Sequence, residues 1–199
     1  MCTKINLKNV KIAAAALCCS LFFYSCMSVK KTEVCSRNLS GKGIKDSQEL
    51  SLFFTVHNPD CDKEYVKKLA ELYISESEME NINSDAAFVQ MCLETGFLTF
   101  GNLVVPEMNN FCGLGAMDEE HPGEWFINTE TGVRAHIQHL QAYATTEDVE
   151  LHNPLVDPRY SWPHKAKNAQ TVFDLAGSWA ADKEYGLKLD NLLTELEMF

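Results

Sequence analysis

Residues 83–96 read Asn-Ser-Asp-Ala-Ala-Phe-Val-Gln-Met-Cys-Leu-Glu-Thr-Gly, and they are the strongest indication of how the chain folds. Between Ala86 and Leu93 every side chain except that of Gln90 is apolar. A helix with this pattern has no solvated face, so we expect it to lie inside a hydrophobic core.

Residues suited to helix ends flank the apolar segment. Asn83 or Ser84 can cap the first backbone amides, and Asp85 suits the positive N-terminal end of a helix. Gly96 can end the helix in a left-handed conformation. The sequence therefore predicts one short helix with both ends defined.

Glu94 is the carboxylate in the last turn of this predicted helix. Burial and the negative end of the helix dipole both disfavour the ionised form, so we expect a raised pKa. A carboxyl group that keeps its proton can act as a general acid toward a sugar or amide leaving group. An exposed glutamate in a final turn fits the pattern equally well, and this stretch alone leaves both interpretations open.

Composition limits the remaining possibilities. The chain has 199 residues, of which 46% are hydrophobic, which is enough for one core. Its formal net charge of −11 argues against a nucleic acid partner, because phosphate binding needs a basic surface. The strand signal is weak throughout and no repeats occur, so we expect a mainly α domain over residues 48–199.

The N-terminal residues look like an export signal. A basic start precedes an apolar run over residues 12–24, which is short for a permanent membrane span. Phe23-Tyr24-Ser25-Cys26 looks like the lipobox of a bacterial lipoprotein, although its two aromatic residues depart from that motif. We expect a signal peptide over residues 1–25, lipidation at Cys26 and a flexible tether over 26–47, with plain cleavage or an uncleaved anchor as alternatives.

The expected location is therefore the cell envelope, as a periplasmic lipoprotein attached to a membrane. An exported location permits disulfides. A disulfide between Cys92 and Cys112 is conceivable, although Cys92 is better explained as a small core residue.

His136 and His139 lie three residues apart on a predicted helix, but no third ligand is evident. We expect neither a metal nor a cofactor. The cysteines of the mature chain are spaced in a way that matches no zinc-binding pattern, and they are Cys26, Cys35, Cys61, Cys92 and Cys112.

Two loops carry the remaining polar signals. Residues 109–115 form a glycine-spaced loop with two adjacent asparagines, and it lacks the lysine and hydroxyl of a phosphate loop. Such a loop suits hydrogen bonds to a neutral ligand. Residues 118–125 are acidic and turn-rich, which is typical of a solvated loop or a mobile lobe.

Four blocks, in this order, resemble glycoside hydrolase family 73, the glucosaminidase domains of bacterial cell-wall autolysins. They are Glu94-Thr95-Gly96-Phe97, residues 109–114, Asp157-Pro158-Arg159-Tyr160 and residues 179–185. The resemblance spans about residues 50–196. It implies a lysozyme-like helical fold with a substrate cleft and a small mobile lobe. It also implies hydrolysis of the β-1,4 bond between N-acetylglucosamine and N-acetylmuramic acid in the glycan strand of peptidoglycan.

The resemblance assigns roles to individual positions. Glu94 matches the catalytic acid, although Phe97 stands where tryptophan is usual. Asn110 and Gly113 match a block that forms a wall of the cleft. In that block Cys112 replaces an aromatic residue and a common lysine is replaced by Gly115, which alters the expected substrate contacts.

Two tyrosines match the remaining blocks. Tyr160 and Tyr185 are expected to stack on a sugar or to hydrogen-bond to it.

A second carboxylate is expected in the acidic lobe. Glu124, directly before Trp125, is the chosen residue, with Glu119 and Glu120 as rivals. It would either activate water or attack the sugar directly. The acetamido group of the substrate can also take this role, which would make Glu124 dispensable.

Other functions stay open at this stage. The same cleft with one glutamate also serves muramidases and lytic transglycosylases. A non-catalytic lipoprotein that binds glycan or assists assembly is a further alternative. Nothing in the sequence indicates an oligomer, and a monomer is expected.

Overall fold

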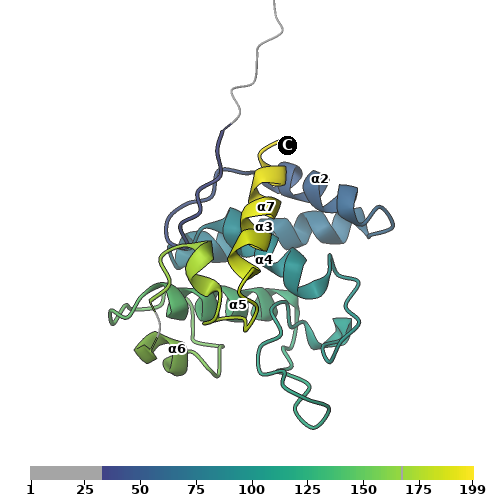
Figure 1. Cartoon of the computed structure of the whole chain (residues 1–199). Helices are drawn as coiled ribbons and strands as arrows, with labels where there is room; N and C mark the ends of the chain where they lie inside the picture. The colour runs from purple at the N-terminus through teal and green to yellow at the C-terminus, as the bar shows by residue number, and fades with distance from the viewer. Residues whose placement is uncertain (1–32, 167) are drawn as a thin grey trace, which may run out of the picture. The chain divides into compact units, whose positions relative to one another are not determined.

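The computed structural model describes residues 33–166 and 168–199, so the expected signal peptide and the lipidation of Cys26 lie outside the described residues (Figure 1). Within them the chain forms six α-helices, two short 3-10 helices and a few isolated β-bridges. The helices are α2 (Ser47–His57), α3 (Lys63–Met79), α4 (Ser84–Thr95), η1 (Pro106–Met108), α5 (Thr129–Ala144), α6 (Ser161–Ala166), η2 (Val172–Leu175) and α7 (Tyr185–Leu196). The expected mainly α, lysozyme-like fold is confirmed.

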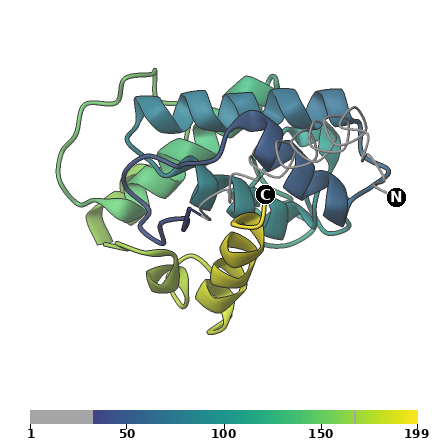
Figure 2. The same cartoon turned by 90° about the horizontal axis from the view of Figure 1, so that it is seen from above.

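Helix α4 forms the centre of the core, as its apolar sequence predicts. The Asn83 side chain accepts hydrogen bonds from the first amides of α4, and Gly96 ends the helix with φ 55°. The side chains from Ala86 to Cys92 are buried. Helices α2, α3, α5 and α7 all contact α4. Figure 2 shows α3 along one edge and α7 along the opposite edge, with α4 between them.

The segment before α2 packs on the domain, where a flexible tether was expected up to residue 47. Cys35 and Leu39 are buried in the core. The Arg37 guanidinium forms ion pairs with Asp190 and Glu197 at 2.6 and 2.5 Å, which fixes the segment to α7. Nothing in the sequence indicated this packing, because the few apolar residues of this segment are too irregularly spaced to form a periodic pattern. The tether prediction therefore fails for residues 35–45.

Within residues 33–166 and 168–199 we find no helix that combines the length and the hydropathy required to cross a bilayer.

Two glutamates on α3 have contrasting environments, which makes them a matched pair for a stability test. The buried Glu76 carboxylate accepts hydrogen bonds from Arg134 at 2.9 and 2.8 Å and from Asn153 at 2.9 Å. Glu78 pairs with Lys42 at 3.2 Å on the surface. We expect Glu76→Gln to lower the free energy of unfolding by about 2–3 kcal/mol, because the Arg134 guanidinium loses its buried charged partner and keeps only the exposed Glu130.

Glu78→Gln is the control, and we expect it to leave the stability unchanged within experimental error, because exposed ion pairs contribute little. Urea unfolding measures both variants. Equal changes for the two would show that the Glu76–Arg134 pair contributes no more than a surface pair.

Candidate active site

A cavity of about 340 Å³ opens at the C-terminal end of α4. Four segments meet there: the last turn of α4, the loop over residues 100–104, the loop over residues 110–116, and the segment that leads into α7. The lining residues are Glu94, Thr95, Phe100, Asn102, Leu103, Val104, Asn110, Cys112, Gly113, Ala116, Trp179, Ala180 and Tyr185. The cavity thus joins the end of a central helix to two loops that follow it in sequence and to a segment from the far end of the chain.

Glu94 is the acid of this cavity. Its Oε1 accepts a hydrogen bond from Trp179 Nε1 at 2.9 Å and a short one from the Tyr185 hydroxyl. Burial raises the pKa of Glu94, and these two hydrogen bonds partly oppose the increase. The raised pKa expected from the sequence is confirmed.

The two oxygens of Glu94 differ in their surroundings. Both hydrogen bonds that the described residues make to the carboxyl group end on Oε1. Oε2 is therefore the oxygen on which a proton is best placed. Burial raises the pKa of Tyr185 well above its usual range, so this residue keeps its proton and remains a donor when Glu94 ionises.

Trp179 reaches Glu94 because other rings surround its indole. The centroids of His136, His139 and Tyr143, all on α5, lie 5.8, 5.1 and 5.0 Å from that of Trp179. Each of the two histidines has its own polar partner. His139 Nδ1 lies 2.8 Å from Asp157 Oδ2, and His136 contacts Tyr73 and Gln90. Both histidines therefore pack against Trp179 and are held there by polar partners of their own.

Asn110 and Gly113 lie on the cavity wall. The Asn110 side chain donates to the carbonyls of Leu114 and Glu124 at 2.9 and 3.2 Å and accepts from the Leu114 amide at 2.9 Å. Gly113 has φ 67°, a conformation that favours glycine. Asn110 thus organises the loop through its own side chain, and contact of either residue with a sugar stays a prediction.

Tyr160 and Glu124 do not line this cavity. The Tyr160 hydroxyl donates to Gln141 Oε1 at 2.6 Å, and its ring stacks on His164. Glu124 is half-buried, and its carboxylate lies so close to Gly115 that a Cβ there would sit 3.1 Å from Oε1. The structure therefore brings together Glu94, Tyr185, Asn110 and Gly113, while the roles of Tyr160 and Glu124 stay predictions.

Two residues that matter to the site were missed. Trp179 was recognised only as part of a sequence block, yet it donates directly to Glu94. Gln90 was noted only as the polar exception on an apolar helix, yet its amide donates to the Tyr185 hydroxyl at 3.0 Å. The signal for Gln90 was present, because a single polar side chain on a fully buried helix must find a buried partner.

The cysteine question is settled for the described thiols. Cys35, Cys61, Cys92 and Cys112 are free, so Cys92 and Cys112 form no disulfide. Cys92 is a core residue, as expected. Cys112 lines the cavity beside Glu94, and burial raises its pKa well above the usual range for a thiol.

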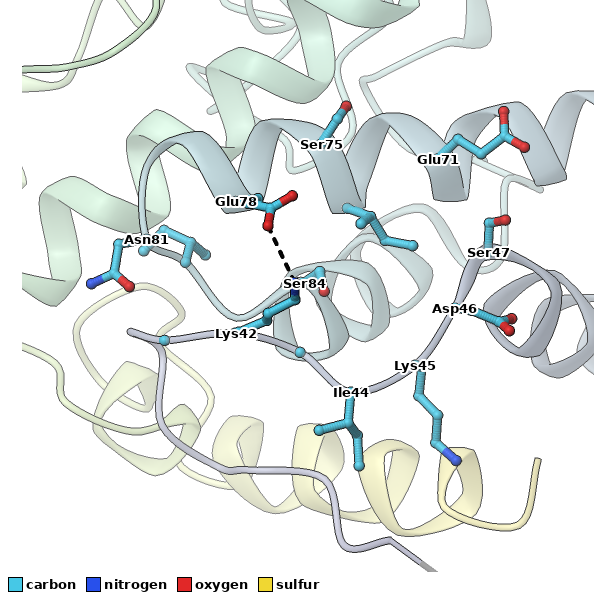
Figure 3. Close-up of a pocket in the computed structure, with 14 residues that line it drawn as sticks. Lys42, Ile44, Lys45, Asp46, Ser47, Glu71, Ser75, Glu78, Asn81 and Ser84 are labelled. Carbon is cyan, nitrogen blue, oxygen red and sulfur yellow. Dashed lines mark hydrogen bonds and ion pairs between the residues drawn. The ribbon is translucent and has the colours of Figure 1, made fainter.

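A larger cavity of about 620 Å³ lies at the other end of α4 (Figure 3). The segment over residues 41–47 and helix α3 border it, and the Lys42–Glu78 ion pair crosses it. Ser84 on its wall and Glu94 are separated by roughly 15 Å along the helix axis. We assign the chemistry to the smaller cavity, because that one holds a half-buried carboxyl group with a raised pKa.

Comparisons with known proteins agree with this geometry. A family model described as "Glucosaminidase: Mannosyl-glycoprotein endo-beta-N-acetylglucosaminidase" matches residues 70–198. The chain is also 41% identical over 158 residues to an "Uncharacterized protein" of Borreliella burgdorferi, and the match covers 79% of this chain and 76% of that protein. No solved structure matches the chain. The family match includes every residue that lines the cavity around Glu94.

Proposed function

The chain belongs to the glucosaminidase family, and from this premise we propose that it hydrolyses the β-1,4 bond between N-acetylglucosamine and N-acetylmuramic acid in peptidoglycan. Membership makes it a glycoside hydrolase that acts on a glycan. The finer proposal rests on the half-buried Glu94, with its raised pKa and both hydrogen bonds on Oε1.

In the proposed mechanism, protonated Glu94 donates its proton from Oε2 to the glycosidic oxygen as the bond to the anomeric carbon breaks. The carboxylate that forms is stabilised by the hydrogen bonds from Trp179 and Tyr185, which are already in place before the reaction. Positive charge develops at the anomeric carbon and is quenched by water, with or without a covalent intermediate.

Glu124 is the proposed second carboxylate. Its backbone is bound to the loop over residues 109–116, which we call the cleft loop, through the Asn110 side chain and through the hydrogen bond from its own amide to the Leu114 carbonyl at 2.8 Å. We expect Glu124→Gln to lower turnover about 100-fold, within the range for loss of an acid or base group. Initial rates on purified peptidoglycan measure this.

The exposed neighbours Glu119 and Glu120 supply controls, and their glutamine variants should keep full turnover. Wild-type turnover in folded Glu124→Gln, Glu119→Gln and Glu120→Gln proteins would assign the second role to the acetamido group of the substrate.

We also propose that the protein acts in the cell envelope as a lipoprotein held by Cys26. This proposal rests on the basic start, the apolar run and the lipobox-like residues of the N-terminal sequence. Metabolic labelling with a fatty acid probe tests it, because Cys26→Ser should abolish the label.

The proposed activity is tested by incubating the purified protein with peptidoglycan and counting new reducing ends. A hydrolase releases them in proportion to time and enzyme concentration. Sedimentation of the protein with peptidoglycan, without release of new ends, would instead support a glycan-binding protein.

A further inference from the structure

A chain of buried polar groups runs behind Glu94 and joins four helices. The Tyr73 hydroxyl on α3 lies 2.8 Å from His136 Nδ1 on α5. His136 Nε2 lies 3.2 Å from Gln90 Oε1 on α4, and Gln90 Nε2 lies 3.0 Å from the Tyr185 hydroxyl on α7. The Tyr185 hydroxyl then reaches Glu94. All four groups behind Glu94 are buried, so water does not compete for these bonds.

The direction of each hydrogen bond in this chain follows once Tyr185 donates to the Glu94 carboxylate. A tyrosine hydroxyl can donate one hydrogen bond, and Tyr185 donates it to the Glu94 carboxylate. The oxygen of Tyr185 must then accept from the Gln90 amide nitrogen, which leaves Gln90 Oε1 to accept from His136 Nε2. All donors therefore point toward Glu94.

Neutral His136 is what allows this arrangement. Burial lowers the pKa of His136 to about 3, so the ring has one N–H near neutral pH. That N–H lies on Nε2, and Nδ1 accepts from the Tyr73 hydroxyl. A buried Gln90 amide turned by 180° would place its NH₂ group against the Nε2–H of His136, and two donors would face each other.

We propose that Gln90 and His136 are positioning residues that fix the direction of the Tyr185 O–H bond toward Glu94 Oε1 and so keep Oε2 as the proton-donating oxygen. The inference rests on the proposed function, because it explains how the acid is prepared. If the Gln90 amide were reversed, its carbonyl oxygen would accept the hydrogen bond from the Tyr185 hydroxyl, and the Glu94 carboxylate would lose that donor. Hydrogen bonds in such a chain also strengthen one another.

The test follows the titration of Glu94 without using its activity. Trp179 donates to Glu94, so its fluorescence reports the ionisation of that carboxyl group. Trp125 and Trp162 are 63% and 60% exposed and are replaced by phenylalanine in every protein compared. We expect Gln90→Met to raise the titration midpoint by about half a pH unit, and Tyr185→Phe by about one unit, because a donor to the carboxylate is weakened or lost.

Since Gln90 acts through Tyr185, the variant that combines Gln90→Met and Tyr185→Phe should have the same titration midpoint as Tyr185→Phe alone. Independent, additive shifts would overturn the inference, and so would an unchanged midpoint in folded Gln90→Met. If that variant does not fold, Gln90→Glu keeps the shape and still accepts from His136, and a larger upward shift is expected in it.

Two controls make the readout specific. Glu94→Gln should remove the Glu94 transition, and a fluorescence change that persists in this variant is assigned to His136 or His139, whose rings pack on Trp179. Gln138→Met changes an equally buried glutamine on α5, whose side chain bonds to the loop over residues 154–157, and should lower stability without moving the midpoint. The titratable groups that face Glu94 are Tyr185 from α7 and Cys112 from the cleft loop, and both have pKa values well above the usual range.

The outcome separates this inference from the proposed function. A protein that does not cleave glycan, but whose Glu94 midpoint moves as described, would retain the inference and lose the proposed reaction. If the protein cleaves glycan but the Glu94 midpoint does not move in folded Gln90→Met, the proposed reaction is retained and the inference is lost.

Discussion

Replacement of Glu94 by glutamine is expected to lower turnover on peptidoglycan about 1000-fold, within the range for loss of a general acid. Glutamine cannot donate a proton to the glycosidic oxygen. The fold should persist, because the amide oxygen can still accept from Trp179 and Tyr185. Initial rates of reducing-end release measure the loss, and urea unfolding confirms that the protein is folded.

Glu107→Gln is the matched control, because Glu107 is an exposed glutamate on η1 outside the cavity. It should keep full activity. Near wild-type turnover in folded Glu94→Gln would remove Glu94 from the mechanism.

The pH dependence of turnover follows from the same carboxyl group. Burial raises the pKa of Glu94, so it stays protonated to a higher pH than an ordinary glutamate. A general acid works only while protonated, and activity should therefore fall as the pH rises through this pKa. The fall should lie at a higher pH than the ordinary glutamate pKa of about 4.3.

The second large effect is expected on stability. Gly132 on α5 lies against the backbone of the cleft loop, and a Cβ there would sit 1.8 Å from the Asn109 carbonyl oxygen. We expect Gly132→Ala to lower the free energy of unfolding by about 3 kcal/mol. Alanine is the better helix former by about 1 kcal/mol, and the clash with the backbone must exceed that gain. Urea unfolding measures the difference.

Glu130→Ala in the same turn is the control, since it removes only an exposed ion pair with Arg134. Its effect should be smaller than about 0.5 kcal/mol. If Gly132→Ala were as stable as wild type, the close approach of α5 to Asn109 would be disproved.

Local patterns made the central helix predictable. The Asn83 cap, the apolar run and Gly96 all act within one helix, and the structure contains each of them as expected. The raised pKa of Glu94 was also predictable, because burial of the helix implied desolvation. Each of these inferences needed only residues close together in the sequence.

Long-range pairings could not be predicted in the same way. Tyr185 lies 91 residues beyond Glu94, and Trp179 lies 85 residues beyond it. Only the resemblance to a family pointed to Tyr185, and nothing indicated that Trp179 would donate to Glu94. Tyr160 came from the same resemblance, yet it bonds to Gln141 away from the cavity.

The segment before α2 illustrates the same limit. Its polar composition resembled a tether, and its attachment depends on Arg37 meeting Asp190 and Glu197 at the far end of the chain. Opposite charges separated by more than 150 residues give no local pattern. Such contacts become visible only in the folded chain.

The identity of the sugar at the new chain ends distinguishes the proposed reaction from its alternatives. Purified peptidoglycan is digested with the wild-type protein, and the released fragments are reduced and analysed by mass spectrometry. We expect N-acetylglucosamine at the reducing end, with no fragments above background from Glu94→Gln. N-acetylmuramic acid or its anhydro form at the new ends would contradict the proposed reaction. Release of fragments by the Glu94→Gln protein would contradict the role of Glu94.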